Sequence, residues 1–315
     1  MPVYKIHHIT RYEYDSPVKE SISEIKLYPY SCPEQQTLQQ DIMITGSPRI
    51  EIYTDYWGNN AGVFNLLAPH QSMTIESRLL VNTIGKASPE HISIGFDELQ
   101  QEVSTNIRLW ELSVPEEIGA QQMISEIIAP VYREKKSVAE TISYFSSYVF
   151  QHFRYIKDVT DIETTVDEIF RHRSGVCQDF AHVLLQLLRT VHIPARYVSG
   201  YICPNKNGMR GEGATHAWVE AWVPGYGWAG IDPTNNMWVT DTHVKLSVGR
   251  YFKDCTPVKG TFKGTAQQTL SLYVSVGHED GSGFEQPDNI KMEVQPSGKT
   301  AEKIREPAKG QQQQQ

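Results

Sequence analysis

Cys177 stands at the start of a strongly apolar segment. It follows Ser174-Gly175-Val176 and precedes apolar residues at helical spacing, which end before Ile193-Pro194: Phe180, Val183, Leu184, Leu187, Leu188 and Val191. This pattern predicts a helix with Cys177 in its first turn, where unpaired peptide N–H groups and the helix dipole stabilise a negative charge. A thiol at this position is suited to act as a nucleophile, although a small cysteine that only packs a helix start fits the segment as well.

His216 lies in a segment, 213–223, whose residues alternate in character. Ala217, Val219, Ala221 and Val223 share one face of the predicted strand, and His216, Trp218, Glu220 and Trp222 share the other. The Ala/Val face is the expected core face, so His216 points to the opposite side of the sheet. A half-exposed histidine without a chemical role is the alternative interpretation.

Asp232 ends the next predicted strand, after a turn at Pro224-Gly225-Tyr226-Gly227. A plain four-residue loop would pair Asp232 with Val219 and turn its carboxylate to the wrong face. An odd-length loop or a single bulge would instead place Asp232 on the face of His216. A catalytic interpretation therefore requires that irregularity; otherwise Asp232-Pro233-Thr234 is only a turn at the end of a strand.

A thiol, an imidazole and a carboxylate together can carry out acyl transfer. Cys177 would attack a carbonyl group, and His216 would protonate the leaving amine and then activate the second acceptor. Asp232 would fix the tautomer of the imidazole. The backbone N–H of Cys177 would contribute to an oxyanion hole. His182, further along the Cys177 helix, is a rival base, but its apolar surroundings favour a structural role.

These residues require a scaffold with both helices and strands. Short strands with turn signals predict an N-terminal β-sandwich or barrel over 1–86. Helical spacing near 115–131, 135–152 and 165–173, and strand patterns at 195–202, 215–223, 228–232 and 270–276, predict an α+β fold. We accordingly expect a helical connector (87–134), a catalytic core (135–250), a C-terminal β segment (251–278) and a disordered tail (279–315).

Composition excludes several classes of protein. The 315 residues carry a net charge of −8, which gives no basic surface for nucleic acid or an anionic membrane. No apolar run approaches the roughly 18 residues of a membrane span, and no secretory signal is visible, so we expect a cytoplasmic protein. The four cysteines are widely spaced and no metal-ligand motif occurs, which argues against disulfides, zinc and other metals.

Several segments together resemble the transglutaminase-like superfamily of bacterial cysteine proteases. They are Gly175-Val176-Cys177-Gln178-Asp179-Phe180-Ala181, Pro194-Ala195-Arg196-Tyr197-Val198-Ser199-Gly200-Tyr201, His216-Ala217-Trp218-Val219-Glu220, Gly227-Trp228 and Asp232-Pro233-Thr234-Asn235. Asp55-Tyr56-Trp57-Gly58-Asn59 is similar to the β-rich region that precedes the core in one bacterial branch. The resemblance implies a papain-like core, in which a helix carrying the cysteine packs on an antiparallel sheet. It also implies a Cys177-His216-Asp232 triad and no cofactor.

The resemblance does not fix the reaction, because the superfamily includes cross-linking enzymes, peptidases and amidases. Hydrolysis of a peptide or amide bond in a peptide or protein substrate is the expected activity, since water needs no dedicated site. Transfer to an amine, as in protein-glutamine cross-linking, is the first alternative. A non-catalytic binding module on the same fold is the second.

Overall fold

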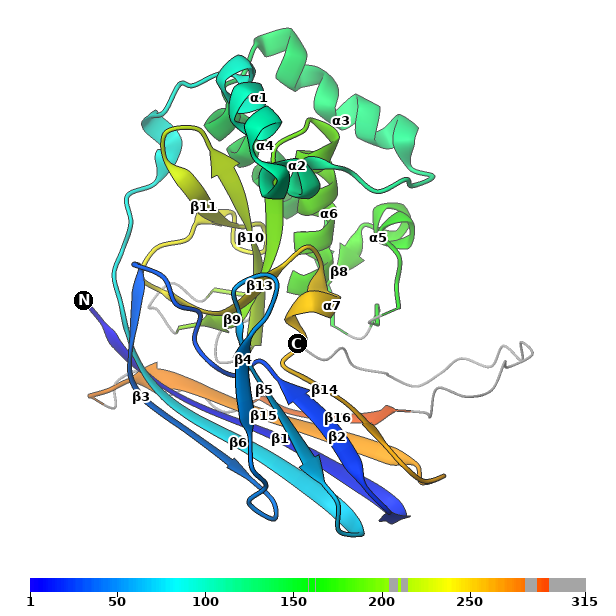
Figure 1. Cartoon of the computed structure of the whole chain (residues 1–315). Coiled ribbons are helices and arrows are strands. Elements are labelled where there is room, and N and C mark those ends of the chain that lie inside the picture. Colours follow the sequence, from blue (N-terminus) through cyan, green and yellow to red (C-terminus); the bar gives the residue numbers. More distant parts are fainter. Residues whose placement is uncertain (158, 162, 204–208, 211–214, 281–287, 295–315) are drawn as a thin grey trace.

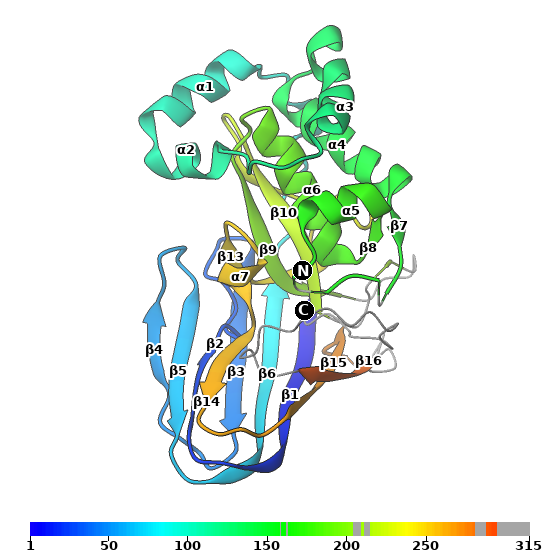
Figure 2. The same cartoon turned by 90° about the vertical axis from the view of Figure 1, so that its right-hand side faces the viewer.

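The computed structural model describes residues 1–157, 159–161, 163–203, 209–210, 215–280 and 288–294 (Figure 1). Two sheets form a β-sandwich at one end of the molecule, and a third sheet lies with most of the helices at the other end (Figures 1 and 2). Strands and helices are thus largely segregated along the chain, which confirms the predicted α+β class.

The N-terminal strands contribute to both sheets of the sandwich. Their bounds are β1 Val3–Val18, β2 Ser21–Ile25, β3 Gln35–Ile44, β4 Glu51–Thr54, β5 Asn60–Leu66 and β6 His70–Thr83. In β6, Met73, Ile75, Leu79 and Val81 point alternately into the core, as the period-two pattern predicts. Apolar side chains of both sheets form one continuous cluster between them.

The C-terminal strands complete this sandwich. They are β14 Val258–Phe262, β15 Gln268–His278 and β16 Asp288–Val294, and the sheet orders are β16-β15-β1-β6-β3 and β14-β2-β5-β4. The prediction of a disordered tail over 279–315 is wrong for 288–294, because β16 pairs with the otherwise open edge of β15. Residues 281–287 and 295–315 lie outside the described part of the chain.

Most of the helices belong to the middle of the chain, residues 89–190. Their bounds are η1 Pro89–His91, α1 Phe96–Thr105, α2 Ile107–Ser113, α3 Gln121–Glu134, α4 Val138–His152, α5 Val166–His172, α6 Cys177–Thr190 and α7 Phe252–Cys255. The expected helix start near Pro115 is wrong, because α3 begins only at Gln121. Glu116 N donates to Gln186 and Ala120 N donates to Asp167, so tertiary contacts hold this segment in a non-helical conformation. Among the described residues no helix combines the length and apolarity needed to span a bilayer.

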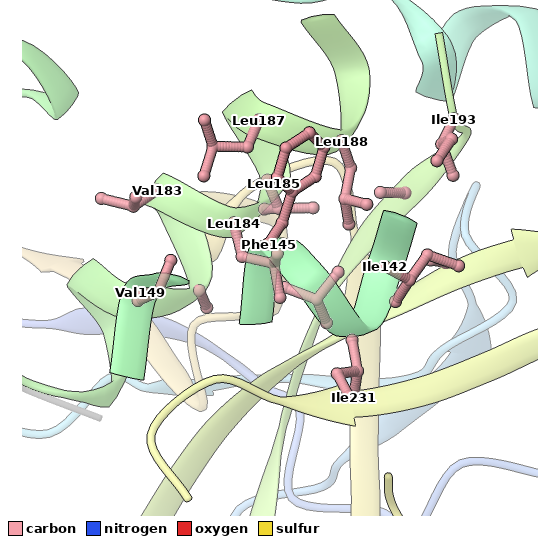
Figure 3. Close-up of a cluster of buried hydrophobic side chains, with 14 of the residues drawn as sticks. Ile142, Phe145, Val149, Val183, Leu184, Leu185, Leu187, Leu188, Ile193 and Ile231 are labelled. Atoms are coloured by element: carbon pink, nitrogen blue, oxygen red, sulfur yellow. The ribbon is translucent and has the colours of Figure 1, made fainter. Parts of the chain in front are cut away.

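The third sheet carries two of the predicted site residues. Its strands are β9 Ala195–Ile202, β10 Thr215–Val223, β11 Gly227–Asp232, β12 Met237–Trp238 and β13 His243–Gly249, in the order β12-β11-β10-β9-β13; β7 Arg154–Tyr155 and β8 Ser174–Gly175 form a separate pair. The Ala/Val face of β10 packs in the same apolar cluster as α4 and α6. Figure 3 shows side chains of both helices in this cluster, among them Phe145 and Leu184.

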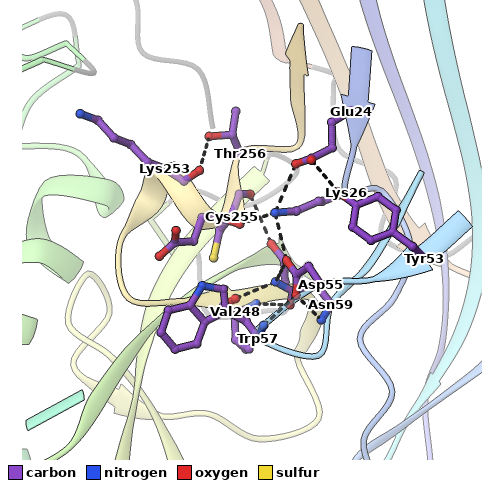
Figure 4. A network of polar contacts seen from close by, with 12 residues as sticks. Glu24, Lys26, Tyr53, Asp55, Trp57, Asn59, Val248, Lys253, Cys255 and Thr256 are labelled. Carbon is purple, nitrogen blue, oxygen red and sulfur yellow. Dashed lines mark hydrogen bonds and ion pairs between the residues drawn. The ribbon is translucent and has the colours of Figure 1, made fainter. Parts of the chain in front are cut away.

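A buried polar network joins the sandwich to the third sheet (Figure 4). Asn59 donates from Nδ2 to the carbonyl oxygen of Val248 at 2.8 Å and accepts from Val248 N at 2.7 Å. Lys26 Nζ lies 3.0 Å from Asp55 and also donates to the carbonyl oxygen of Asp254. The Asp55–Asn59 loop thus fixes the position of β13 and α7 relative to the sandwich.

Candidate active site

Cys177 is the first residue of α6 and is almost fully buried, at 1% exposure. The carboxylate of Asp179 accepts hydrogen bonds from Val176 N and from Thr160 Oγ1, each at 2.7 Å. Gly175 allows this packing, because a Cβ there would lie 2.3 Å from Asp179 Oδ2. The prediction that Cys177 lies in the first helical turn is confirmed, although the N-cap is Val176 rather than Ser174 or Gly175.

The hairpin between β10 and β11 has the irregularity that the catalytic interpretation requires. Val223 pairs with Gly227, which leaves a three-residue loop. Gly225 and Gly227 have φ of +75° and +89°, in the left-handed region that favours glycine. Val219 then pairs with Ile231, so Asp232 falls opposite Trp218 and on the same face of the sheet as His216.

His216 and Asp232 form a fully buried pair. Nε2 of His216 lies 2.8 Å from Oδ2 of Asp232, and neither side chain is exposed. Asp232 Oδ1 accepts from Thr234 N at 2.8 Å, and Oδ2 accepts from Asn235 Nδ2 at 2.7 Å. His243 Nε2 approaches Oδ2 at 3.4 Å. This set of donors compensates for the burial of the carboxylate charge.

Electrostatics favour the charged forms of this pair. Burial by itself would lower the pKa of His216, but the charge of Asp232 and the hydrogen bond to it outweigh burial and raise this pKa to about 10. Burial would raise the pKa of Asp232, yet His216 and His243 hold it well below its ordinary value. At neutral pH the structure thus favours an imidazolium next to a carboxylate.

The second ring nitrogen of His216 faces a different environment. Nδ1 is buried and has no nitrogen or oxygen partner among the described residues. Cys177 contributes, through hydrogen bonding and charge, to the raised pKa of His216, so its thiol lies next to this ring. The structure therefore brings together Cys177, His216 and Asp232. A protonated imidazole next to a thiol can stabilise the thiolate form.

His182, the rival base, has a structural environment. Its Nε2 accepts a hydrogen bond from Phe252 N at 3.3 Å, and its ring packs against Tyr197. Burial lowers its pKa to about 4, so it is neutral near pH 7. These contacts connect α6 with α7 and give His182 a structural role.

Sequence reasoning missed His243, which belongs to β13 and is only 5% exposed. The alternation of Val244, Leu246 and Val248 with polar residues could have indicated this strand, but it does not show which strand it pairs with or that it places this ring next to Asp232. Ligand atoms of His216, Asp232 and His243 lie within 4.8 Å of one another, which is close enough to surround a metal ion. Such an ion would have to displace the proton and hydrogen bonds of His216, so the geometry favours the hydrogen-bonded network.

The fold and the site define an α+β protein with a papain-like core. Residues 125–233 match the family model of the transglutaminase-like superfamily, and residues 4–82 match that of the bacterial transglutaminase-like N-terminal region. An uncharacterized protein of Mycobacterium leprae is 32% identical over 279 residues, which cover 86% of this chain and 97% of the relative. The chain belongs to the transglutaminase-like superfamily.

Two further similarities are informative. The crystal structure of a protein from Cytophaga hutchinsonii, described as a candidate cysteine protease, superposes with a TM-score of 0.70 at 20% identity and covers 89% of this chain and 92% of that one. This similarity supports the fold. The protein-glutamine gamma-glutamyltransferase of Pseudomonas aeruginosa is 41% identical over 73 residues, which are 22% of this chain and 11% of that relative.

Proposed function

We propose that this protein is a thiol-dependent acyl-transfer enzyme that hydrolyses peptide or amide bonds through Cys177, His216 and Asp232. One observation carries the proposal: a fully buried His216–Asp232 pair, 2.8 Å apart, lies beside a cysteine at the first residue of a helix. Membership of a superfamily of cysteine proteases and transglutaminases supports the same class of enzyme.

In the proposed reaction the Cys177 thiolate attacks the substrate carbonyl carbon, and a C–S bond forms. The proton on Nδ1 of His216 passes to the leaving nitrogen as the C–N bond breaks, which gives an amine and a thioester. Water then attacks the thioester carbonyl carbon and gives one proton to Nδ1. The C–S bond breaks, which restores the thiolate, and the carboxylic acid product leaves and loses its remaining proton to the solvent. Asp232 keeps the Nε2 proton in place throughout.

Transfer of the acyl group to an amine differs only in the second acceptor, and it is the alternative reaction. The name of the Pseudomonas aeruginosa relative favours this alternative. A transferase must hold its amine in place and exclude water from the thioester. Hydrolysis needs neither feature, so we retain it as the main proposal.

The decisive experiment is a peptide-library digest analysed by mass spectrometry, with and without a primary amine such as putrescine. We expect free carboxylate products that disappear with Cys177→Ala and persist with Cys32→Ala, because Cys32 lies between β2 and β3, strands of the sandwich. A predominance of amine adducts would replace hydrolysis by transfer. Equal product formation by wild type and Cys177→Ala would refute the enzyme proposal.

Selective alkylation distinguishes an enzyme from a binding module. At pH 6.5 we expect iodoacetamide to modify Cys177 faster than Cys32, Cys203 or Cys255. Burial raises the pKa of all three other thiols, that of Cys32 to about 11. Slow and equal modification of all four cysteines would favour the binding module.

A further inference from the structure

A second feature of the molecule lies beside α6, outside the Cys177–His216–Asp232 cluster. It is a cavity of about 670 Å³ between α6, the loop 116–118, the start of α5 (163–167) and residues 251–253 at α7. We call it the α6 groove. In Figures 1 and 2, α5 lies alongside α6. The groove contains none of the three proposed catalytic side chains, so it is available for another function.

The α6 groove begins one residue from the proposed nucleophile. Gln178, which follows Cys177, lines it and is only 3% exposed. Its Oε1 is buried without a hydrogen-bond partner in the described part of the chain. A buried amide oxygen without a donor is unfavourable, whereas a carboxamide that meets a ligand can both accept through its oxygen and donate through its nitrogen. Peptide groups offer this complementary pair, so Gln178 points to a ligand with a peptide backbone.

The length of the groove suits an extended chain. Its α6 residues run from Gln178 to Arg189 along one side of the helix. At a rise of about 1.5 Å per residue these eleven steps span about 16 Å. An extended peptide advances about 3.3 Å per residue, so about five residues would fill this distance. The groove therefore matches a short peptide segment better than a small ligand.

The charges around the groove select the kind of peptide. Three exposed carboxylates, those of Glu116, Glu117 and Glu163, lie on its rim, and the exposed cation there is Lys253. Asp167 adds a fourth carboxylate, whose oxygens accept from backbone N–H groups. The rim is thus predominantly negative and favours a positively charged occupant.

Arg189, the other cation of the groove, does not cancel this charge at the rim. Its side chain is buried at 1% exposure, and Nη2 donates to the carbonyl oxygens of Ala195 at 2.8 Å and Arg250 at 2.7 Å. Its Nε also donates to Ala195. The guanidinium therefore connects α6 with β9 and with Arg250, the residue after β13, and it has few donors left for a ligand.

We propose that the α6 groove is an exosite that binds an extended, positively charged segment of the peptide substrate, with Gln178 hydrogen-bonded to its backbone. This inference rests on the proposed function, because it assigns the groove to the substrate of Cys177. Lysine or arginine side chains of the substrate would face Glu116, Glu117 and Glu163. The enzyme would accordingly prefer cationic substrates.

Binding of fluorescein-labelled peptides to the full chain, followed by anisotropy, tests the exosite. The probes are (Lys-Ala)₄ and (Glu-Ala)₄, each at low and at physiological salt. We expect the lysine peptide to bind, and the triple variant Glu116→Gln, Glu117→Gln, Glu163→Gln to bind it about tenfold more weakly. The matched control replaces three exposed carboxylates elsewhere and should bind as the wild type does: Glu51→Gln, Glu90→Gln and Glu126→Gln.

Gln178→Leu tests the backbone contact. We expect about fivefold weaker binding of the lysine peptide, at unchanged melting temperature. Equal affinity for both peptides, or equal weakening by the groove and control variants, would overturn the exosite. Alkylation of Cys177 is measured on the same samples and reports on the proposed function separately. Failed peptide binding with selective alkylation intact would refute the exosite alone. Peptide binding without selective alkylation would refute the enzyme, and with it the assignment of the groove to a substrate.

Discussion

Asp232→Asn removes one negative charge while preserving the shape of the side chain. In the wild type the charge of Asp232 outweighs the effect of burial and raises the pKa of His216 from 6.5 to about 10. The difference between these pKa values corresponds to about 5 kcal/mol in favour of the protonated ring. Without that charge burial dominates, and we expect the pKa of His216 to fall to its ordinary value or below.

The variant also changes the tautomer of the ring. The new amide can present its Nδ2–H to Nε2 of His216, so the ring proton moves to Nδ1, the nitrogen on the side of Cys177. The neutral ring can then neither accept a proton from the thiol nor stabilise a thiolate by charge. Cys177 should consequently lose the neighbouring positive charge that stabilises a thiolate, and it should react more slowly near neutral pH.

The measurement is the rate of iodoacetamide modification of Cys177 from pH 6 to pH 9, read by peptide mass mapping. In the wild type His216 stays protonated below about pH 10, so the rate should be nearly independent of pH. In Asp232→Asn we expect a rate at least about tenfold lower at pH 6.5 that rises with pH. Asp241→Asn, which removes a carboxylate outside the site, should keep the wild-type profile.

The two buried cysteines provide an internal control for unfolding. Cys203 and Cys255 are fully buried, so a variant that unfolds would reveal itself by their rapid modification. A folded Asp232→Asn protein with the same flat profile as the wild type would refute the electrostatic reasoning. Such a result would mean that Asp232 does not control the protonation of His216.

Three further predictions concern stability, and each is measured by urea denaturation. Asn59→Ala loses both buried hydrogen bonds to β13 and should lower the free energy of unfolding by about 2–4 kcal/mol, whereas the exposed Asn65→Ala should change it by about 0.5 kcal/mol or less. Two neighbouring cations outweigh burial and lower the pKa of Glu220 to about 2. The charge of Glu220 therefore adds about 3 kcal/mol to the free energy of unfolding above pH 4.5, and this contribution is lost as the pH falls through 2. Glu220→Gln should abolish this part of the pH dependence. Gly175→Ala places a Cβ 2.3 Å from Asp179 Oδ2, so we expect a lower free energy of unfolding and slower modification of Cys177. An unchanged free energy of unfolding would show that the Asp179 carboxylate moves at little cost.

The elements nearest the site could be predicted from the sequence because their periodicity is strong. The strand expected over 215–223 is β10, Thr215–Val223, and the helix expected to begin near Cys177 is α6. In both, an apolar face packs in one buried cluster, so local pattern and tertiary packing agree. The roles of Cys177, His216 and Asp232 in catalysis stay predictions that the alkylation experiments test.

Other features depend on contacts between distant segments and could not be read locally. The register that brings Asp232 to the face of His216 follows from a three-residue loop, and the sequence left loop length open. His243 reaches Asp232 only because β13 pairs with β9 across the sheet. Ile290, Met292 and Val294 alternate with polar residues, which fits a strand, but this short pattern in a polar segment does not identify β15 as the partner of β16.

Hydrogen bonds from the sandwich converge on one segment of the core, residues 243–255, so the sandwich holds this segment in position. Gln35 donates to the carbonyl oxygen of Lys245 and accepts from its N–H, Asn59 does the same with Val248, and Lys26 donates to the carbonyl oxygen of Asp254. The same segment begins with His243, which touches Asp232, and carries the α7 residues that line the α6 groove. A disturbance at Asn59 should therefore alter both the modification of Cys177 and the binding of the lysine peptide, although Asn59 belongs to neither site.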